Sequence, residues 1–585
     1  MSDLLIRGAE AIWTGLAGEA MRAPAGADIR VRGGMIAAVG TLSPEPGERV
    51  LDASGCVVYP GWVNTHHHLF QSLLKGIPAG INLALVPWLG AVPVPYRRFF
   101  DDEASLRLAA RIGLVELLLS GCTTIADHQY HYWPGMPFDA SRAVFEEAER
   151  LGVRMVLCRG GQTQSRAMTD AKAPPQVSPE TLDGFLSSVE RDVRNFHDPS
   201  PTAMRRVVSA ITTPSWSCSP QQLREMARAA RALGIRLHSH LSESFDYVRW
   251  AREVHGCTPL EFVADHEWVG SDVWFAHMVH LNDQEIAMCA ATGTGIAHCP
   301  QSNARLGSGI ARIPEAMAAG VPIGLAVDGA ASNEAADMIN EAHACWMLHR
   351  ADPRSGERPD ARAHASRVMQ PGGHAGAITA EDVVHLGTVG GARVLGLDGV
   401  GSIEVGKAAD LALYDLDHPR YFGLHDPASG PVVSGGQASL KAVLVQGRVE
   451  WITDSRVERL SQDFYWFSPV LKRQLDHLRA DAVARPRTED EIRAVVAACA
   501  QGGVPITVRG SGTGNYGQCM PLHGGVILDL SAYNKLLWHK PGIARAQAGI
   551  RMMELDRQTQ AVEGSGQGWE LRCVPSTFRS ATLGG

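Results

Sequence analysis

Histidine stands out in this sequence, because several of its 23 histidines lie in tight clusters. The first cluster is His66-His67-His68, which follows an apolar β-type run. His66 and His68 are two residues apart, and on a strand that spacing places both imidazoles on the same face. Two imidazoles held in this way are a natural pair of ligands for zinc or a similar metal. A solvated histidine-rich turn is the alternative interpretation of this cluster taken alone.

Further side chains able to do chemistry end other β-type runs. They are His240 with Glu243 close behind it, His277 and Asp328. A single histidine at the end of a strand is more often structural than a ligand. Several such positions in one chain instead predict a shared site, in which a bound metal activates water for hydrolysis.

The elements that must position these groups alternate between short apolar runs and longer helical patterns. The β-type runs are 57–64, 123–127, 154–159, 206–212, 235–241, 273–277, 293–299 and 322–328. Helical patterns between them cover 104–119, 141–151, 179–195, 220–233 and 283–291. Eight alternations over about 270 residues predict a (β/α)8 barrel, with the chemical groups at its C-terminal mouth. A doubly wound α/β sheet is the structural competitor.

Strand-like segments flank the predicted barrel on both sides. Short strands before residue 57 can pair with strands at 401–415 and 440–451, so that both flanks build one small β-sandwich. We therefore predict a sandwich from 1–56 and 398–455, a barrel at 57–397, a linker at 456–467 and a separate α+β unit at 468–585.

Several motifs are similar to those of the amidohydrolase superfamily, in the branch of aminohydrolases that act on purine, pterin and triazine rings. They are NTHHHLFQ at 64–71, HSHLSE at 238–243, HCPQSN at 298–303 and VDGAASN at 327–333, in the family's order. The resemblance covers about residues 1–455. It implies a metal-dependent deaminase with His66, His68, His240 and Asp328 as metal ligands. It also implies Glu243, His277 and Asp328 as catalytic residues.

The chemistry of such a site follows from its residue types. A bound Zn²⁺ lowers the pKa of water to about 7, and three imidazoles with one carboxylate leave it an open position. Asp328 can take the proton of the water, and Glu243 is placed to protonate a ring nitrogen. His277 can stabilise the tetrahedral intermediate.

One metal is expected rather than two. Two-metal relatives commonly bridge their ions with a carboxylated lysine on the fourth strand, and the run 206–212 contains no lysine. We expect zinc, although iron suits the same nitrogen and oxygen ligands.

The expected substrate is a small heterocycle, a flat 2-amino-4-oxo pterin or purine ring such as isoxanthopterin or 8-oxoguanine. The resemblance implies that Gln71 contacts the amide edge of the ring. Arg159 can hold a ring carbonyl oxygen through its forked donors. Tyr132, in an aromatic loop, can stack on the ring, and Trp88 can line the mouth. A structural salt bridge for Arg159 and ordinary packing for the two aromatic residues are the alternatives.

The C-terminal segment resembles the first half of a vanillyl-alcohol-oxidase-type FAD-binding domain. The motifs are VRGSGTGNYGQ at 508–518, VILDLSAYNKL at 526–536 and PSTFRSATLGG at 575–585. Backbone N–H groups of a glycine-rich loop can cradle the pyrophosphate of FAD. The loop residues are Arg509, Gly510, Ser511, Gly512, Thr513 and Gly514.

The chain ends inside the last of these motifs, which we interpret as truncation or a fused gene fragment. An FAD-linked oxidoreductase, with the barrel as a partner domain, is the alternative function.

Composition excludes several other classes. The chain has 585 residues, 45% of them hydrophobic and 20% charged, which is typical of a globular protein. A net charge of −8 offers no basic surplus for nucleic acid or an anionic membrane. Apolar runs such as 111–119 are too short to span a bilayer, and no secretory signal is visible. The 11 cysteines form no CxxC pair, which predicts reduced thiols in the cytoplasm. The sequence leaves open whether the chain forms a homo-oligomer.

Overall fold

The computed structural model describes residues 3–165, 179–352, 378–437, 439–452, 455–464, 468–540, 542–560 and 569–584. The chain divides into two compact units, Met1–Ile452 and Thr453–Gly585. Each unit is described by itself.

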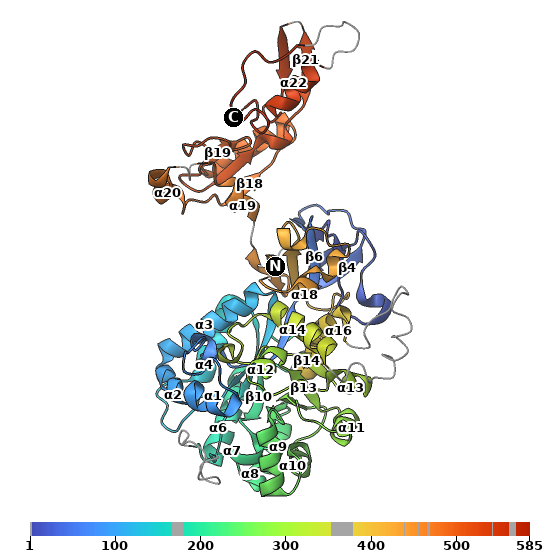
Figure 1. Ribbon diagram of the computed structural model, residues 1–585, viewed down its shortest axis with the longest axis vertical. Coiled ribbons are helices and arrows are strands. Elements are labelled where there is room, and N and C mark those ends of the chain that lie inside the picture. The colour runs from blue at the N-terminus through green and yellow to red at the C-terminus, as the bar shows by residue number, and fades with distance from the viewer. Residues whose placement is uncertain are drawn as a thin grey trace. The chain divides into compact units, whose positions relative to one another are not determined.

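The centre of the first unit is a sheet of eight parallel strands whose spatial order follows their order in the chain. The strands are β7 (Trp62–His67), β8 (Cys122–Gln129), β9 (Arg154–Arg159), β10 (Arg205–Ile211), β11 (Leu237–Leu241), β12 (Val273–His277), β13 (Gly295–His298) and β14 (Ile323–Leu325). The first and last strands are joined by Asp328 N donating to His66 O (3.1 Å) and by Thr65 Oγ1 donating to Leu325 O (2.8 Å). The sheet therefore curls into the predicted (β/α)8 barrel (Figure 1).

Helices cover the outside of the barrel. The main ones are α3 (Glu103–Leu119), α4 (Ala140–Leu151), α6 (Leu182–Phe196), α8 (Pro220–Ala232), α9 (Phe245–His255), α10 (Pro259–Asp265), α11 (Asp283–Thr292) and α14 (Met338–Ala351). Local sequence fixes where they begin, because a polar side chain accepts a hydrogen bond from the first turn. Asp102 caps α3, and Ser219 forms a capping box with Gln222 at α8. The positions at which these helices begin set the lengths of the loops that follow the barrel strands.

The predicted first barrel strand, 57–64, is two strands in the structure. β6 (Cys56–Pro60) pairs antiparallel with β15 (Leu411–Asp415) in a flanking sheet, and β7 begins the barrel. Gly61 lies between them, where a Cβ would stand 2.2 Å from Thr123 Oγ1 on β8. A glycine lets the chain pass this close as it changes sheets. The sequence could not predict this change of sheet, because residues 57–64 form one continuous apolar run.

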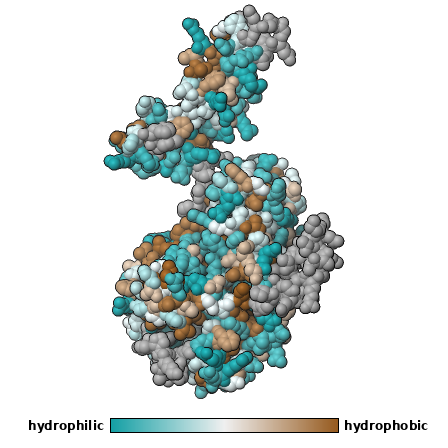
Figure 2. Space-filling view, viewed as in Figure 1, coloured by the Kyte–Doolittle hydropathy of each residue, from teal (hydrophilic) through white to brown (hydrophobic). Residues whose placement is uncertain are grey.

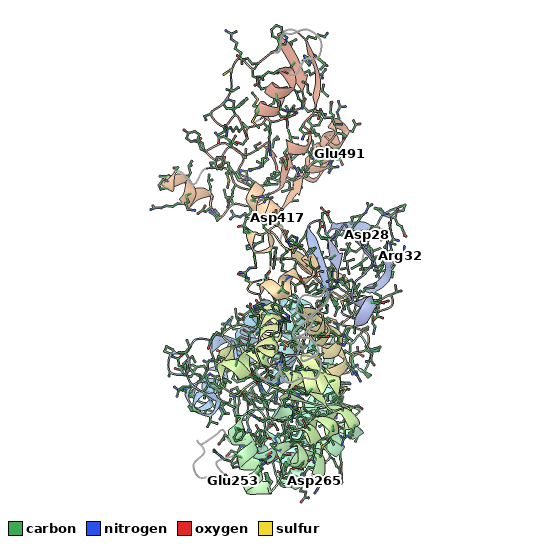
Figure 3. The ribbon with its side chains drawn as sticks, turned by 45° about the vertical axis from the view of Figure 1, so that its right-hand side comes forward. Asp28, Arg32, Glu253, Asp265, Asp417 and Glu491 are labelled. Atoms are coloured by element: carbon green, nitrogen blue, oxygen red, sulfur yellow. The ribbon has the colours of Figure 1, made fainter. Side chains whose placement is uncertain are left out.

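The flanks form the predicted β-sandwich. One sheet has the order β4-β3-β1-β5 and the other β17-β16-β15-β6-β2. The strands not yet given are β1 (Leu4–Arg7), β2 (Ala11–Ile12), β3 (Asp28–Arg32), β4 (Met35–Gly40), β5 (Arg49–Asp52), β16 (Leu440–Val445) and β17 (Arg448–Ile452). Apolar side chains from both sheets share one core, and Asp28 (Figure 3) accepts bonds from Gly8 N (3.1 Å) and Leu42 N (3.2 Å).

The second unit contains a three-stranded parallel sheet of order β18-β20-β19. Its strands are β18 (Ala482–Ala484), β19 (Ile506–Arg509) and β20 (Val526–Asp529), with helix α21 (Glu489–Gly502) between the first two. The remaining elements are α19 (Ser455–Leu460), α20 (Pro469–Leu475), the hairpin β21 (Leu536–Lys540) and β22 (Ile543–Ala546), and α22 (Met552–Gln560). The helix at 488–501 and the strand at 504–508 are thus found within two residues of their predicted starts.

Polar and apolar side chains are interspersed over the face of the first unit that Figure 2 shows. Among the described residues, none of the helices has the length and apolar character needed to cross a bilayer.

Candidate active site

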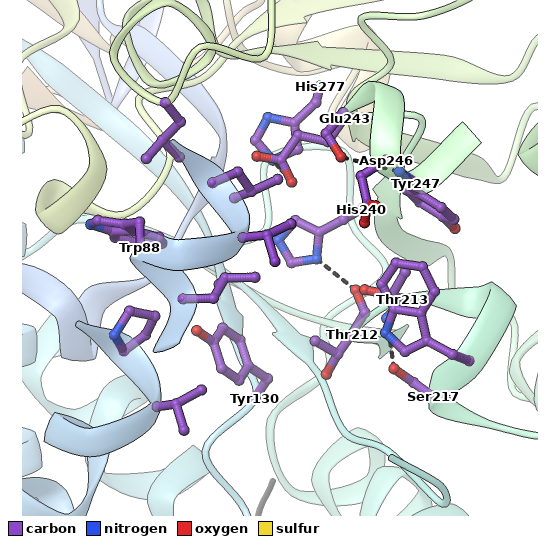
Figure 4. Close-up of a pocket in the computed structure, with 18 of the residues that line it drawn as sticks. Trp88, Tyr130, Thr212, Thr213, Ser217, His240, Glu243, Asp246, Tyr247 and His277 are labelled. Carbon is purple, nitrogen blue, oxygen red and sulfur yellow. Dashed lines mark hydrogen bonds and ion pairs between the residues drawn. The ribbon is translucent and has the colours of Figure 1, made fainter. Parts of the chain in front are cut away.

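The side chains predicted to do chemistry meet at the C-terminal end of the barrel (Figure 4). His66 and His68 lie at the end of β7, His240 in β11 and His277 at the end of β12. Asp328 lies three residues beyond β14. Parallel strands of a barrel present their carboxyl ends on one side, which is why residues this far apart in sequence converge.

Two of the imidazoles are oriented by backbone carbonyls. His68 Nδ1 lies 2.8 Å from His128 O, and His240 Nδ1 lies 2.6 Å from Thr212 O. A carbonyl oxygen only accepts, so in both rings the hydrogen-bond network assigns the proton to Nδ1. Each Nε2 is therefore left with a lone pair directed into the site.

The third imidazole is oriented by another histidine. His66 Nδ1 lies 2.8 Å from His238 Nε2, while His238 Nδ1 lies 3.0 Å from Trp274 O. The carbonyl places the proton of His238 on its Nδ1, so its Nε2 must accept from His66. His66 Nε2 is thus also unprotonated and faces the same point.

The atoms that meet here, the Nε2 atoms of the three imidazoles and Oδ1 of Asp328, are all hydrogen-bond acceptors. His68 Nε2 lies 3.1 Å from His240 Nε2, and Asp328 Oδ1 lies 3.4 Å from His66 Nε2 and 3.3 Å from His68 Nε2. Burial lowers the pKa of His68 to about 3 and that of His66 well below its usual value, so both rings are neutral at pH 7. Only a cation relieves the repulsion among the lone pairs, and nitrogen with oxygen ligands suits a divalent metal.

The carboxylate of Asp328 is held from its far side. Oδ2 accepts from Ser302 Oγ (2.6 Å) and Ser332 Oγ (3.2 Å), and Oδ1 accepts from Gly329 N (2.7 Å). Asp328 has φ +61°, a left-handed conformation that costs a non-glycine residue of order 1–3 kcal/mol. The strained turn and the two hydroxyls together aim Oδ1 at the imidazoles.

Glu243 and His277 lie beside this cluster. His277 Nδ1 is 2.9 Å from Asn303 Oδ1, and its Nε2 is 3.7 Å from Glu243 Oε2. Burial, and then the charge of Asp328, raises the pKa of Glu243 to about 8. Glu243 therefore carries a proton near neutral pH and can act as a general acid.

A cavity of about 670 Å³ opens onto these groups, within the usual range for small-molecule sites. Gln71, Trp88 and Tyr132, for which substrate contacts are predicted, are among the residues that line it. Gln71 Nε2 lies 3.1 Å from Tyr130 Oη, so the amide stands in the wall next to His68. Tyr130, from the same predicted aromatic loop as Tyr132, lines it too, and side chains that line it and were not predicted include Arg97, Thr212, Thr213, Trp216, Tyr247 and Trp250.

Arg159 does not belong with the substrate contacts. Its guanidinium forms two bonds with the Glu180 carboxylate (2.6 and 2.7 Å), donates to Ser188 Oγ (3.1 Å) and lies 3.9 Å over the Tyr132 ring. It is buried outside the residues that line the 670 Å³ cavity. The ion pair uses the donors expected for a ring carbonyl, so the structure favours the alternative role of Arg159, a structural salt bridge.

Several supporting residues were missed by sequence reasoning. His238, Ser302 and Asn303 lie in the motifs HSHLSE and HCPQSN, but nothing in the letters assigns them a task. His128, at the end of β8, is buried, and a ligand nitrogen of it lies within 4.8 Å of those of His66, His68 and His240. The sequence feature that could have identified His128 is its place among polar residues at the end of a predicted barrel strand.

The glycine-rich loop follows β19 in the second unit. Gly512 has φ +65°, and in the described residues the backbone N–H groups of 510–512 make no hydrogen bond. Successive free amides of this kind fit a pyrophosphate. Arg509 is committed elsewhere, since its guanidinium donates to Gln462 O (2.6 Å). In the described residues the loop amides are thus available to a ligand, whereas the arginine donors are used within the unit.

Comparison with known proteins decides the family. Residues 57–449 match the model of the amidohydrolase family. The chain belongs to that family. Isoxanthopterin deaminase from an unknown prokaryotic organism is 55% identical over 447 residues, which are 76% of this chain and 91% of the relative. The 8-oxoguanine deaminase of Pseudomonas aeruginosa is 37% identical over 424 residues, 72% of this chain and 88% of the relative.

Solved structures agree with this amidohydrolase assignment. An amidohydrolase from an environmental sample of the Sargasso Sea has a TM-score of 0.63 and 49% identity, with 77% of this chain and 93% of that chain covered. Atrazine chlorohydrolase from Arthrobacter aurescens, complexed with zinc, has a TM-score of 0.69 and 29% identity, with 78% and 98% covered.

The comparisons confirm the predicted barrel and the predicted class, a hydrolase acting on carbon–nitrogen bonds in cyclic compounds. The amidohydrolase family is metal-dependent. Residues 480–585 match the model of an FAD binding domain, which confirms the second predicted domain type.

Proposed function

We propose that this amidohydrolase is a mononuclear, metal-dependent deaminase of a 2-amino-4-oxo pterin or purine ring. One observation carries the proposal. Three unprotonated imidazole nitrogens and the Asp328 carboxylate converge on one point, beside a glutamic acid that is protonated near neutral pH. The names of the two deaminase relatives support the choice of reaction.

His66, His68, His240 and Asp328 would hold the metal. We propose zinc as its identity, and iron suits the same ligands. When bound, such a metal lowers the pKa of a coordinated water toward about 7 and so supplies a nucleophile at neutral pH. The site shows no lysine with which to bridge a second ion, since β10 (Arg205–Ile211) contains none.

The chain's own residues move the protons. Asp328 takes a proton from the attacking water. Glu243 donates its proton to the ring nitrogen next to the amino-bearing carbon, which makes that carbon more electrophilic. His277 Nδ1 donates to Asn303 Oδ1, which leaves Nε2 as an acceptor, and Nε2 accepts a hydrogen bond from the attacking water and so orients it. Asp328 then passes its proton to the leaving nitrogen, while the proton of the added hydroxyl goes to Glu243 as the carbonyl forms, so ammonia leaves and both carboxyl groups return to their starting states.

The cavity wall suits a flat bicyclic ring. The Gln71 amide can bond to a ring N–C=O edge, while Trp88, Tyr130 and Tyr132 offer aromatic surface in the same cavity. We propose isoxanthopterin first and 8-oxoguanine second.

An ammonia-release screen over isoxanthopterin, pterin, guanine, 8-oxoguanine and cytosine tests the proposal. A bicyclic 2-amino-4-oxo ring should give the highest kcat/KM. A higher value for cytosine would overturn the substrate while leaving the hydrolase class intact.

FAD binding by the second unit is a separate candidate, favoured by the amides of 510–512, which make no hydrogen bond in the described residues. Flavin absorbance in the purified full chain, lost when Gly512 is replaced by aspartate, is the expected sign of it. A colourless protein that does not take up added FAD would argue against it.

A further inference from the structure

Arg97 is a cation in the cavity wall with no ion pair among the described residues, where Asp101 is a more distant charge acting on it. It follows α2 (Pro93–Tyr96), lines the cavity, and is partly buried. In the described residues no acidic side chain lies within 4.0 Å of its guanidinium, and it donates no hydrogen bond. Burial lowers its pKa from the usual value, although an arginine stays charged at any physiological pH. A partly buried guanidinium with no ion pair has donors that a bound ligand can use.

The other charged groups that line the cavity are accounted for. Arg249 pairs with Asp246 (2.9 Å) and lies 4.0 Å from Glu253, at the exposed mouth. Glu243 is protonated, and Asp328 faces the imidazoles. Among the described residues, Arg97 is therefore the cation of this cavity that is open to a bound molecule.

Arg97 stands apart from the reacting centre. Tyr130 contacts His68, with ring centroids 4.9 Å apart, and its hydroxyl meets the Gln71 amide. The same Tyr130 has Arg97 as an electrostatic neighbour. His68, Tyr130 and Arg97 are thus neighbours in that order, and all three line the cavity.

We propose that Arg97 determines specificity by holding an oxygen acceptor, a ring carbonyl or its enolate, on the substrate ring remote from the amino group. The proposal rests on the deaminase function above. A ring whose amino-bearing carbon lies at the His66–Asp328 centre, with its amide edge at Gln71, extends its second ring along the Tyr130 wall toward Arg97. Arg97 then holds the ring carbonyl that the sequence analysis expected Arg159 to hold.

The chemical consequence is a preference between matched pairs of rings. Isoxanthopterin carries a second-ring carbonyl that pterin lacks, and 8-oxoguanine carries one that guanine lacks. A site built to hydrogen-bond a substrate oxygen rejects the analogue without it, because its own polar group is left unpaired. The wild-type enzyme should favour the oxo-bearing member of each pair.

Arg97→Met tests this with both pairs of substrates. We expect kcat/KM for the oxo-bearing member to fall at least tenfold, mainly through KM, while the value for its partner changes less than threefold. Arg97→Lys should recover part of the loss. Arg98→Met is the matched control, because Arg98 is the exposed neighbour lying over Phe99, and it should leave both ratios unchanged.

The outcomes separate the two proposals. If the wild type deaminates neither pair, the proposed function fails. If the wild type deaminates them but Arg97→Met lowers both members equally, or neither, the assignment of Arg97 is wrong. Binding of the oxo-bearing ring to the variant, followed by its fluorescence, gives a readout independent of turnover and should weaken by the same factor as KM.

Discussion

Proton positions on individual side chains decide what this site can do. The three imidazoles are neutral with Nε2 free, and the nearby carboxyl of Glu243 keeps its proton to about pH 8. A hydrolase needs this division of roles, because a metal requires lone pairs while a ring nitrogen requires a donated proton.

Glu243→Gln should keep the metal and lose most of the deamination. The amide is nearly the same size but cannot deliver a proton, and general acid–base groups typically contribute about 10²–10⁴-fold. Metal content by elemental analysis and kcat by ammonia release check the two halves of the prediction. Turnover close to that of the wild type would remove Glu243 from the role of proton donor.

Convergence of the reactive residues could be predicted from sequence, because barrel strands bring their carboxyl ends together whatever lies between them. Partners could not be predicted in the same way. Arg159 ends a strand just as His277 does, yet its carboxylate partner Glu180 comes from 21 residues farther along the chain. Likewise Arg97, which has no ion pair among the described residues, begins the 3-10 helix η3 (Arg97–Phe100), and no recognised motif surrounds it.

Among the structural elements, the eight barrel strands could be predicted from apolar segments of the sequence. The residues at which those strands begin and end could not. The last run, 322–328, yields a strand of only Ile323–Leu325, and Asp328, three residues beyond it, has a left-handed backbone conformation. The run 57–64 hides a change of sheet at Gly61. Both departures come from tertiary contacts that local hydrophobicity does not encode.

Gly61→Ala should destabilise the first unit by about 1–3 kcal/mol, the usual cost of overpacking. The added Cβ would lie 2.2 Å from Thr123 Oγ1 and 2.3 Å from its Cγ2. Thermal unfolding checks it, with Gly90→Ala as control because a Cβ there meets nothing within 4 Å. Adding Thr123→Ala removes the two closest atoms and should restore part of the loss. No recovery would mean that the contact is not the cause.

Helix α14 carries a buried carboxyl that makes stability depend on pH. Glu341 accepts from Gln301 N (2.9 Å) and Gln301 Nε2 (2.6 Å), and burial raises its pKa from 4.5 to about 8. Between these values the folded chain keeps a proton that the unfolded chain releases, so the stability it confers is full below about pH 4.5 and is lost as pH rises toward 8.

Glu341→Gln should therefore flatten the fall in Tm between pH 5 and 8 relative to the wild type. The exposed Glu253, changed to glutamine in the same way, is the matched control and should leave the profile as it is. A Glu341→Gln profile parallel to that of the wild type would show that this carboxyl does not titrate in the window.

For the whole molecule, the sequence separated two kinds of domain correctly, since an amidohydrolase model and an FAD binding domain model match successive parts of the chain. None of the residues assigned to deamination comes from the second unit. The barrel and its sandwich form a compact unit that ends at Ile452 and contains every residue assigned here to deamination.

Deletion of residues 453–585 should leave kcat and KM for deamination within about twofold of the full chain. Steady-state ammonia release from both proteins, at matched metal content, measures this. A folded, metal-loaded truncated protein with collapsed activity would mean that the second unit takes part in the reaction.

Restoring metal to the stripped enzyme tests the central claim most directly. The full chain is depleted with a chelator and titrated with Zn²⁺, while ammonia release from isoxanthopterin is followed at each addition. Activity should rise from near zero and level off at one equivalent per chain, and His240→Ala should show no such rise. Deamination that persists without metal, or that levels off only at two equivalents, would contradict a mononuclear site held by His66, His68, His240 and Asp328.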